Sequence, residues 1–135
     1  MIDLKKAIEF HGHLGPYLVL GLRAGDLALD KLHAKKYFGI EVTVHCPENP
    51  PPRCFIDGIQ LSTGATFGKG NLHHEKNDTI IAIIKDKSTG NSIHITLNEV
   101  ITKQLQPTLT VPQLETLAQK IATEPVDNIL NIILQ

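Results

Sequence analysis

The chain has 135 residues, of which 41% are hydrophobic and 20% charged, and its formal net charge is -1 at neutral pH. This length suits one domain with a single core, and the composition is ordinary for a globular protein. A near-neutral charge, no Trp and an aromatic content of 4% provide neither a basic patch nor stacking platforms, so we expect no nucleic-acid binding. No apolar run reaches the roughly 18 residues of a membrane span, so we expect no membrane insertion.

The first residues, MIDLKKAIEFHGH, carry charges throughout and lack the apolar stretch of a secretory signal. We therefore expect a cytoplasmic protein in which Cys46 and Cys54 are free thiols or ligands. In an oxidising compartment, the short separation of the two cysteines would permit a disulfide instead.

Hydrophobic periodicity predicts the elements in chain order. A short amphipathic helix over residues 2–10, with Asp3 as its N-cap, precedes a long helix over residues 16–36 that begins at Pro16. The later expected elements are a strand over 39–45, a proline-rich connector (CPENPPPRC), a helix over 55–61, two antiparallel strands over 78–85 and 92–97, and helices over 97–105, 112–123 and 126–134. We expect the apolar last segment to dock on the body of the protein or on another subunit.

Small residues recur at near-helical spacing in the predicted long helix, among them Gly21, Ala24, Gly25 and Ala28. They permit close packing of this helix against a sheet or a partner subunit. Ordinary core packing is the interpretation we favour.

The densest chemistry lies between Cys54 and His74, in CFIDGIQLSTGATFGKGNLHH. Gly64, Gly68 and Gly70 separate its polar residues, which indicates turns or a close approach of the backbone. The stretch is not a phosphate-binding P-loop, because Gly64 is one residue too close to the Gly-Lys pair and no Ser or Thr follows that pair.

His11 and His13 flank one glycine just before the predicted long helix. In an extended segment, residues two apart project the same way, so both imidazoles can address one point. Imidazole is a common ligand of zinc, nickel and iron, and with the Cys54 thiolate it would supply three corners of a tetrahedral site. Histidines that only cap and pack fit the same spacing, and the spacing does not show that the two segments meet.

Other candidates have two interpretations each. Lys69, between two glycines, either binds a carboxylate or phosphate of a small molecule or is a solvated turn residue. Asp57 and Gln60, one turn apart in the predicted helix, can orient a ligand histidine, and a role at the helix start explains Asp57 equally well. The remaining candidates are His73 and His74, expected as exposed loop residues, Cys46 as a weaker ligand, and His33 and His94 as structural or exposed residues of a helix and a strand.

The two stretches HGHLGPYLVLGLRAG and CFIDGIQLSTGATFGKGNL resemble the E-subunit family of formylmethanofuran dehydrogenase (the FmdE-like domain). The resemblance implies a single α+β domain over residues 1–135, with a mostly antiparallel sheet packed by the long N-terminal helix and C-terminal helices. It also implies a homodimer and a metal-binding role in one-carbon metabolism, including methanogenesis, or in metal handling. It assigns metal binding to His11, His13 and Cys54, and ligand binding to Asp57, Gln60, Thr63, Thr66, Lys69 and Asn71.

The sequence departs from the family pattern at two positions. Gly15 and Ala65 stand where many members have cysteine, so His11, His13 and Cys54 are left as the expected ligands of a divalent transition metal, zinc first and nickel or iron as alternatives. A cysteine-rich zinc ribbon that some members carry at the C-terminus is also missing from this sequence.

Three functions follow as hypotheses. The first is a metal-binding accessory protein that can join a molybdenum or tungsten formylmethanofuran dehydrogenase complex. The second is a small metal-dependent enzyme in which metal-bound water, near Lys69 and Asp57, acts on an anionic small molecule. The third is a structural assembly module.

Overall fold

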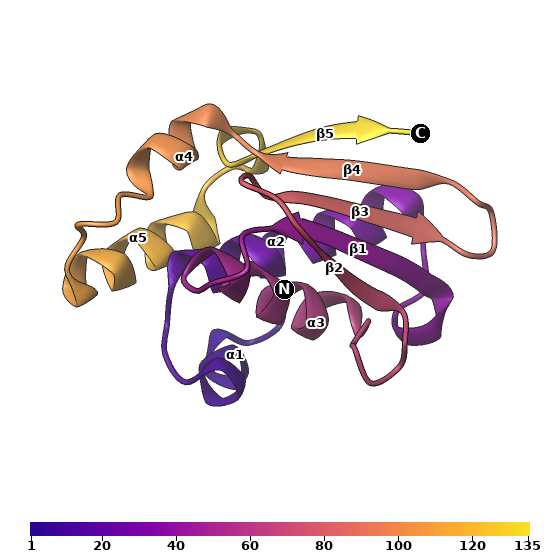
Figure 1. The fold of residues 1–135 in the computed structure, drawn as a ribbon, viewed down its shortest axis with the longest axis horizontal. Helices are drawn as coiled ribbons and strands as arrows, with labels where there is room; N and C mark the ends of the chain where they lie inside the picture. The colour runs from indigo at the N-terminus through magenta and orange to yellow at the C-terminus, as the bar shows by residue number, and fades with distance from the viewer.

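The computed structural model describes residues 1–135, and its central feature is a five-stranded sheet (Figure 1). The strands are β1 (Ile40–Cys46), β2 (Leu72–Lys76), β3 (Ile81–Asp86), β4 (Ser92–Leu97) and β5 (Leu130–Leu134), in the order β2-β1-β3-β4-β5. Strands β1 and β2 are parallel, and every other neighbouring pair is antiparallel. The predicted α+β class with a mostly antiparallel sheet is therefore confirmed.

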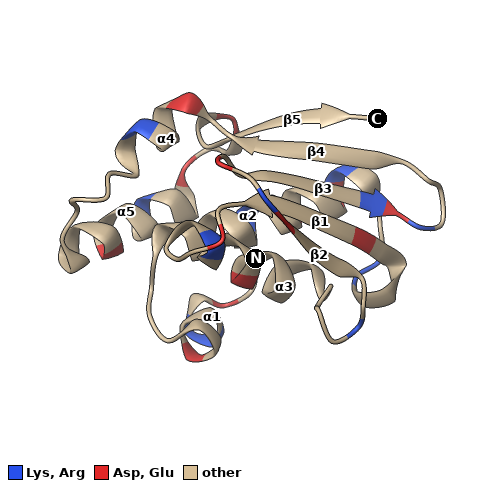
Figure 2. Cartoon of the chain, in the orientation of Figure 1, with Lys and Arg blue, Asp and Glu red and all other residues tan.

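The helices are α1 (Leu4–His11), α2 (Pro16–Leu32), α3 (Phe55–Thr63), α4 (Glu99–Gln104) and α5 (Val111–Thr123). Single 3-10 turns cover Tyr37–Gly39, Pro52–Cys54 and Val126–Asn128. In Figure 1, α2 and α3 lie below the sheet, and α4 and α5 form one end of the molecule. In Figure 2 charges of both signs mix along α1, α4 and α5. No helix of the chain combines the length and the apolar character needed to cross a bilayer.

The core lies between the sheet and the helices. Strand β1 alternates buried and half-buried residues along its whole length, as the sequence predicted for this segment. Ile84 of β3 and Ile93 and Ile95 of β4 are fully buried on the same side as Leu20 and Ala24 of α2. The helices thus cover one face of the sheet, which fixes where α2 and α3 can lie.

Helices α2 and α3 run side by side in the same direction, because successive small residues keep their backbones close. A Cβ added at Gly58 would collide with the carbonyl of Leu18, and one added at Gly25 would collide with the Ser62 side chain. The Ser62 hydroxyl also donates to the Gly21 carbonyl at 3.3 Å. Gly21 and Gly25 of α2 therefore face α3, whereas Ala24 and Ala28 belong to the core that the helices share with the sheet. As a result, the N-terminal ends of the two helices meet.

Local signals set the helix starts. The Asp3 carboxylate accepts a hydrogen bond from the Lys5 amide at 3.0 Å, which confirms the predicted N-cap of α1. Pro16 occupies the start of α2, as expected. Thr110 and Gln113 form a reciprocal capping box at the start of α5.

Several predicted boundaries are wrong. The long helix expected over residues 16–36 ends at Leu32, where His33 takes a left-handed conformation with φ of 52°. The helix expected over residues 97–105 is the shorter α4, because Leu97 belongs to β4 and the Asn98 side chain caps the helix.

The prediction for the last element is also wrong. Residues 126–134 do not form a helix but a 3-10 turn followed by strand β5, which pairs with β4. A short run of Ile and Leu does not distinguish helix from strand by periodicity, and here the free edge of β4 decides the outcome.

His73 and His74 were expected in a loop but belong to strand β2.

Candidate metal centre

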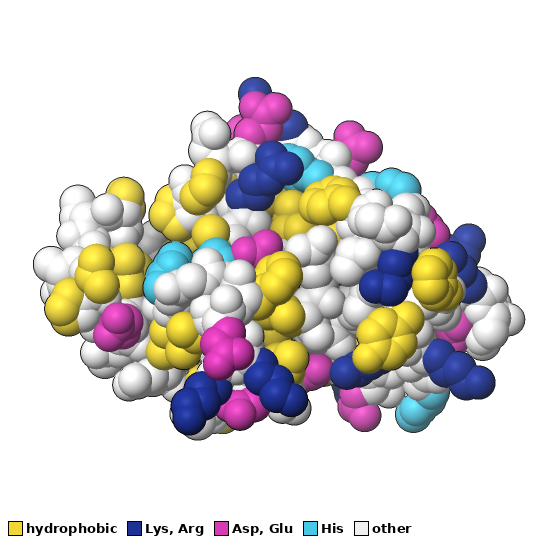
Figure 3. All heavy atoms as spheres, turned by 90° about the horizontal axis from the view of Figure 1, so that it is seen from below, with side chains coloured by type: hydrophobic (Ala, Val, Ile, Leu, Met, Phe, Trp, Pro, Cys, Tyr) yellow, Lys and Arg dark blue, Asp and Glu magenta, His cyan; other side chains and the backbone are white.

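The parallel arrangement of α2 and α3 brings the two histidines and Cys54 to one cavity. His11 and His13 precede α2, and Cys54 immediately precedes α3. All three residues line a cavity of about 420 Å³. Figure 3 shows histidine side chains beside hydrophobic ones toward the end of the molecule where Figure 1 places α5.

His11 is held by a carboxylate from α3. Its Nδ1 lies 2.5 Å from Oδ2 of Asp57, and the imidazole is only 7% exposed. A carboxylate accepts the hydrogen bond, so Nδ1 carries a proton, and in the neutral form of the ring Nε2 then has a free lone pair. This Nε2 is the one buried side-chain nitrogen or oxygen of the chain without a hydrogen-bond partner. A carboxylate on one ring nitrogen and a vacant lone pair on the other is the usual preparation of a metal-ligating histidine.

His13 and Cys54 supply the other two expected donors. The ring centroids of His11 and His13 are 4.6 Å apart, and His13 is exposed. The Cys54 thiol is free and half-buried. Burial, followed by the negative charge of Asp57, raises the pKa of this thiol, so it holds its proton at neutral pH unless a cation displaces it.

The residues fit a metal in kind and in position along the cavity, but their side chains do not converge on one point. No group of three or more His, Cys, Asp or Glu side chains is arranged so as to hold a metal ion. Coordination would require the exposed His13 and the half-buried Cys54 to turn toward Nε2 of His11. The orphaned and buried Nε2 is the observation that favours such a movement, because an unpaired buried polar atom is costly.

The residues expected to bind a ligand divide into a group on α3, which is Asp57, Gln60 and Thr63, and a group in the glycine-rich turn after it. Asp57 contacts His11 beside the cavity. Gln60 lies in the middle of α3 and is half-buried. The buried Thr63 hydroxyl donates to the Ile59 carbonyl at 2.6 Å and accepts from the Ala65 amide at 3.1 Å, which ends α3.

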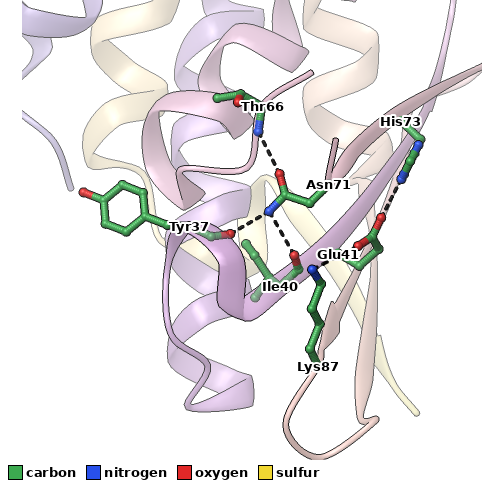
Figure 4. Close-up of polar contacts among 7 residues, drawn as sticks. All are labelled: Tyr37, Ile40, Glu41, Thr66, Asn71, His73 and Lys87. Carbon is green, nitrogen blue, oxygen red and sulfur yellow. Dashed lines mark hydrogen bonds and ion pairs between the residues drawn. The ribbon is translucent and has the colours of Figure 1, made fainter. Parts of the chain in front are cut away.

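Thr66, Lys69 and Asn71 shape the glycine-rich turn between α3 and β2, and Figure 4 shows Thr66 and Asn71. Asn71 accepts from the Thr66 amide at 3.1 Å and donates to the carbonyls of Tyr37 and Ile40 at 2.6 and 3.1 Å. The Lys69 ammonium lies 5.7 Å from the centroid of the Tyr37 ring, a cation–π contact. None of the three lines the cavity of His11, His13 and Cys54. These side chains hold the turn to the start of β1.

The other histidines and Cys46 lie away from this cavity. His73 Nε2 is 2.5 Å from Oε1 of Glu41, and the Lys87 ammonium contacts the same carboxylate at 3.4 Å (Figure 4). His74 Nε2 donates to the carbonyl of Cys46 at 3.0 Å, and Cys46 is buried in the core.

Sequence reasoning missed the residues that enclose the cavity. Tyr17 of α2, Pro51 and Pro52 of the connector, and residues from the segment 105–114, which joins α4 to the first turn of α5, complete its walls. Burial raises the pKa of the Tyr17 phenol, so its hydroxyl stays protonated. Nothing in the sequence pairs residues 105–114 with the histidines, because that contact depends on how α5 packs on α2.

Fold and site together define the class of this protein. It is an α+β domain with two histidines and a cysteine in the wall of one cavity. The chain belongs to the FmdE family, whose model, described as "FmdE, Molybdenum formylmethanofuran dehydrogenase operon", matches residues 10–133. This relates the chain to the E subunit of formylmethanofuran dehydrogenase.

Two similar proteins are consistent with this membership. The crystal structure of a tungsten formylmethanofuran dehydrogenase FmdE-like protein from Syntrophus aciditrophicus matches 98% of this chain and 69% of its own, with a TM-score of 0.66 and 24% identity, a likeness of fold. A probable S-adenosyl-L-methionine-binding protein of Archaeoglobus fulgidus is 36% identical over 73 residues, 51% of this chain. The match spans only 19% of that relative's length.

Proposed function

We propose that the protein is a metal-binding accessory protein related to the E subunit of formylmethanofuran dehydrogenase, working in one-carbon metabolism or in metal handling. His11, His13 and Cys54 hold a divalent transition metal, zinc by preference and nickel or iron as alternatives. The observation that supports this most strongly is the buried Nε2 of His11, which has no partner while Asp57 fixes the opposite ring nitrogen. His13 and Cys54 share the cavity with it.

The test is elemental analysis of purified, tag-free protein after reconstitution with zinc. We expect about one metal per chain for the parent, and loss of most of it in His13→Ala and Cys54→Ser, with unchanged circular dichroism. His73→Ala and Cys46→Ala are the matched controls, because both residues lie outside the cavity, and both variants should keep the metal. A parent that binds no metal, or site variants that retain it, would overturn the proposal.

A small metal-dependent enzyme is the second candidate. Three protein ligands leave one position of a tetrahedral metal for water or substrate, and here that position would open onto the cavity. The anionic substrate expected from Lys69 has no support at the cavity, because no Lys or Arg lines it. A zinc-dependent hydrolysis of neutral esters or amides that is lost in Cys54→Ser would favour this candidate over an accessory role.

Two assemblies belong to the proposal. Family membership supports an association with a molybdenum or tungsten formylmethanofuran dehydrogenase complex, which sedimentation of the purified chain with that complex would detect. A homodimer is supported by strand β5, which pairs with β4 on one side only and exposes Ile133 and Leu134. An unpaired edge strand can pair with its own copy across a twofold axis.

A further inference from the structure

The wall of the metal-centre cavity is mostly apolar, and besides the expected donors its polar residues are Tyr17 and Gln106. Five leucines from three separate segments line it, Leu14, Leu18, Leu105, Leu109 and Leu114. No Lys, Arg, Asp or Glu is among the lining residues. The volume of about 420 Å³ falls within the range of about 300–1,000 Å³ that is typical of small-molecule sites. Such a cavity is much larger than a metal and its water require.

We propose that this cavity binds a small organic ligand with an uncharged apolar body, whose donor head reaches the metal held by His11, His13 and Cys54. The inference rests on the proposed metal-binding function and specifies the ligand class of the same site. The same cavity is lined by the three expected donors and by five leucines. A ligand with a polar head and an aliphatic chain matches both sets of residues.

Because no Lys, Arg, Asp or Glu lines the cavity, the body of the ligand cannot be charged. A charged group placed among the leucines would lose its hydration without gaining a partner of opposite sign. An aliphatic chain would instead gain about 0.8 kcal/mol for each methylene removed from water, or roughly a fourfold increase in affinity per methylene.

Tyr17 lies between this cavity and a second one. Together with Pro52 and Leu105 it lines both this cavity and a second cavity of about 400 Å³, which reaches Asp78, Thr79 and Thr96. A ligand chain that extends toward this shared wall therefore meets a phenol ring and a proline.

Val111 marks the rim of the cavity. It is the first residue of α5, lines the cavity and is 68% exposed. In the unliganded protein a carboxylate at this position stays hydrated, in the first turn of a helix where negative charge is favoured, whereas an apolar chain bound in the cavity would remove part of its hydration. Val100 is a matched position, since it is 59% exposed, lies in the first turn of α4 and does not line this cavity.

The experiment measures binding of acetohydroxamate and hexanohydroxamate to zinc-loaded protein by calorimetry. Both probes present the same metal-binding head, and the longer one adds four methylenes. We expect hexanohydroxamate to bind on the order of 100-fold tighter, Val111→Asp to weaken it about tenfold, and Val100→Asp to leave it unchanged. Equal affinity for the two probes in protein that holds zinc would overturn the inference and leave the metal centre standing.

A second measurement separates this result from failure of the metal centre. Metal-free protein is titrated with 1-hexanol, and binding is followed by the shift in melting temperature in the parent, Val111→Asp and Val100→Asp. Stabilisation by 1-hexanol that only Val111→Asp reduces supports the apolar chamber even when the chain takes up no zinc. Absence of stabilisation, or equal loss in both variants, contradicts it.

Discussion

The imidazole of His11 and the carboxylate of Asp57, 46 positions apart in the chain, are joined by a 2.5 Å contact between Nδ1 and Oδ2. One residue ends α1 and the other lies in the first turn of α3. The contact gives His11 a fixed ring orientation and leaves Nε2 as a lone pair in a buried setting. The geometry of the proposed centre therefore depends on a residue that does not ligate the metal.

Removing this carboxylate should weaken metal binding while the fold survives. Asp57→Asn keeps the side-chain shape but loses the negative charge that fixes the His11 tautomer, so we expect zinc affinity to fall by about 10- to 100-fold. Competition with a chromogenic chelator measures the change. Asp30→Asn, on the exposed end of α2, is the control. Equal affinities in Asp57→Asn and the parent would assign Asp57 to the helix start alone.

The close approach of α2 and α3 should be as important to the site as the donors. Gly58→Ala would drive a methyl group into the Leu18 carbonyl. We expect a loss of about 1–3 kcal/mol in the free energy of unfolding, with weaker zinc binding, because the start of α3 must move away from α2. Gly68→Ala is the control, since its added Cβ would lie 3.8 Å from the nearest atom. Urea denaturation and chelator competition on both variants test this prediction.

The sequence predicted the donor residues of this site better than the helix packing that brings them together. The motifs HGHLGP and CFIDGIQ carry His11, His13 and Cys54, and the structure places all three at one cavity. That they bind a metal stays a prediction. The reason they meet, the parallel contact of Gly25 with Ser62, depends on which faces of two helices pack together. A list of small residues does not specify that choice.

Competition between elements explains the other differences. Residues 130–134 join the sheet because β4 offers an unpaired edge, although the same apolar run suits a helix. The Thr66 hydroxyl accepts from the Lys69 amide, and the Asn71 side chain satisfies backbone groups of residues 66, 37 and 40. Their residue types fit binding and turn formation equally, and only the three-dimensional partners decide.

The Glu41 cluster on the sheet should contribute a small, pH-dependent stabilisation. The hydrogen bond from His73, assisted by Lys87, holds the pKa of Glu41 below its ordinary value of 4.5. A lowered folded-state pKa stabilises the protein above the unfolded-state value, and this contribution disappears as the pH falls through the folded-state pKa. Because the groups are largely solvated, we expect at most about 1 kcal/mol, reduced further by salt.

Urea unfolding of the parent and Glu41→Gln at pH 7 and pH 3 measures this contribution. The variant should be less stable at pH 7, and the gap should narrow at pH 3. Glu75→Gln, an exposed substitution on β2, should show no such convergence. A gap that stays constant with pH would mean that the Glu41 carboxylate has the same pKa in the folded and unfolded chains.

The proposed homodimer makes a separate prediction at the sheet edge. Ile133 is 63% exposed on β5, so Ile133→Lys should leave the fold intact while placing a charge where a second copy would pair. We expect light scattering to give a dimeric mass for the parent and a monomeric mass for this variant. Phe38→Lys, at a position that is 65% exposed and outside β5, is the control. A parent that is monomeric, or a variant that stays dimeric, removes β5 as the interface.

Position 15 offers a gain-of-function test of the proposed centre. A Cβ built on Gly15 would lie 3.3 Å from Nε2 of His13, and the backbone there is extended, with φ of −134°, so a side chain can be accommodated after a small shift of that imidazole. Gly15→Cys would therefore place a thiol beside the other donors and complete a four-ligand shell. We expect zinc affinity to rise by about tenfold or more. Gly15→Ala, which adds the Cβ without sulfur, should not raise it. If the two variants bind zinc equally, residue 15 lies outside the coordination sphere and the metal is held elsewhere than between His13 and Cys54.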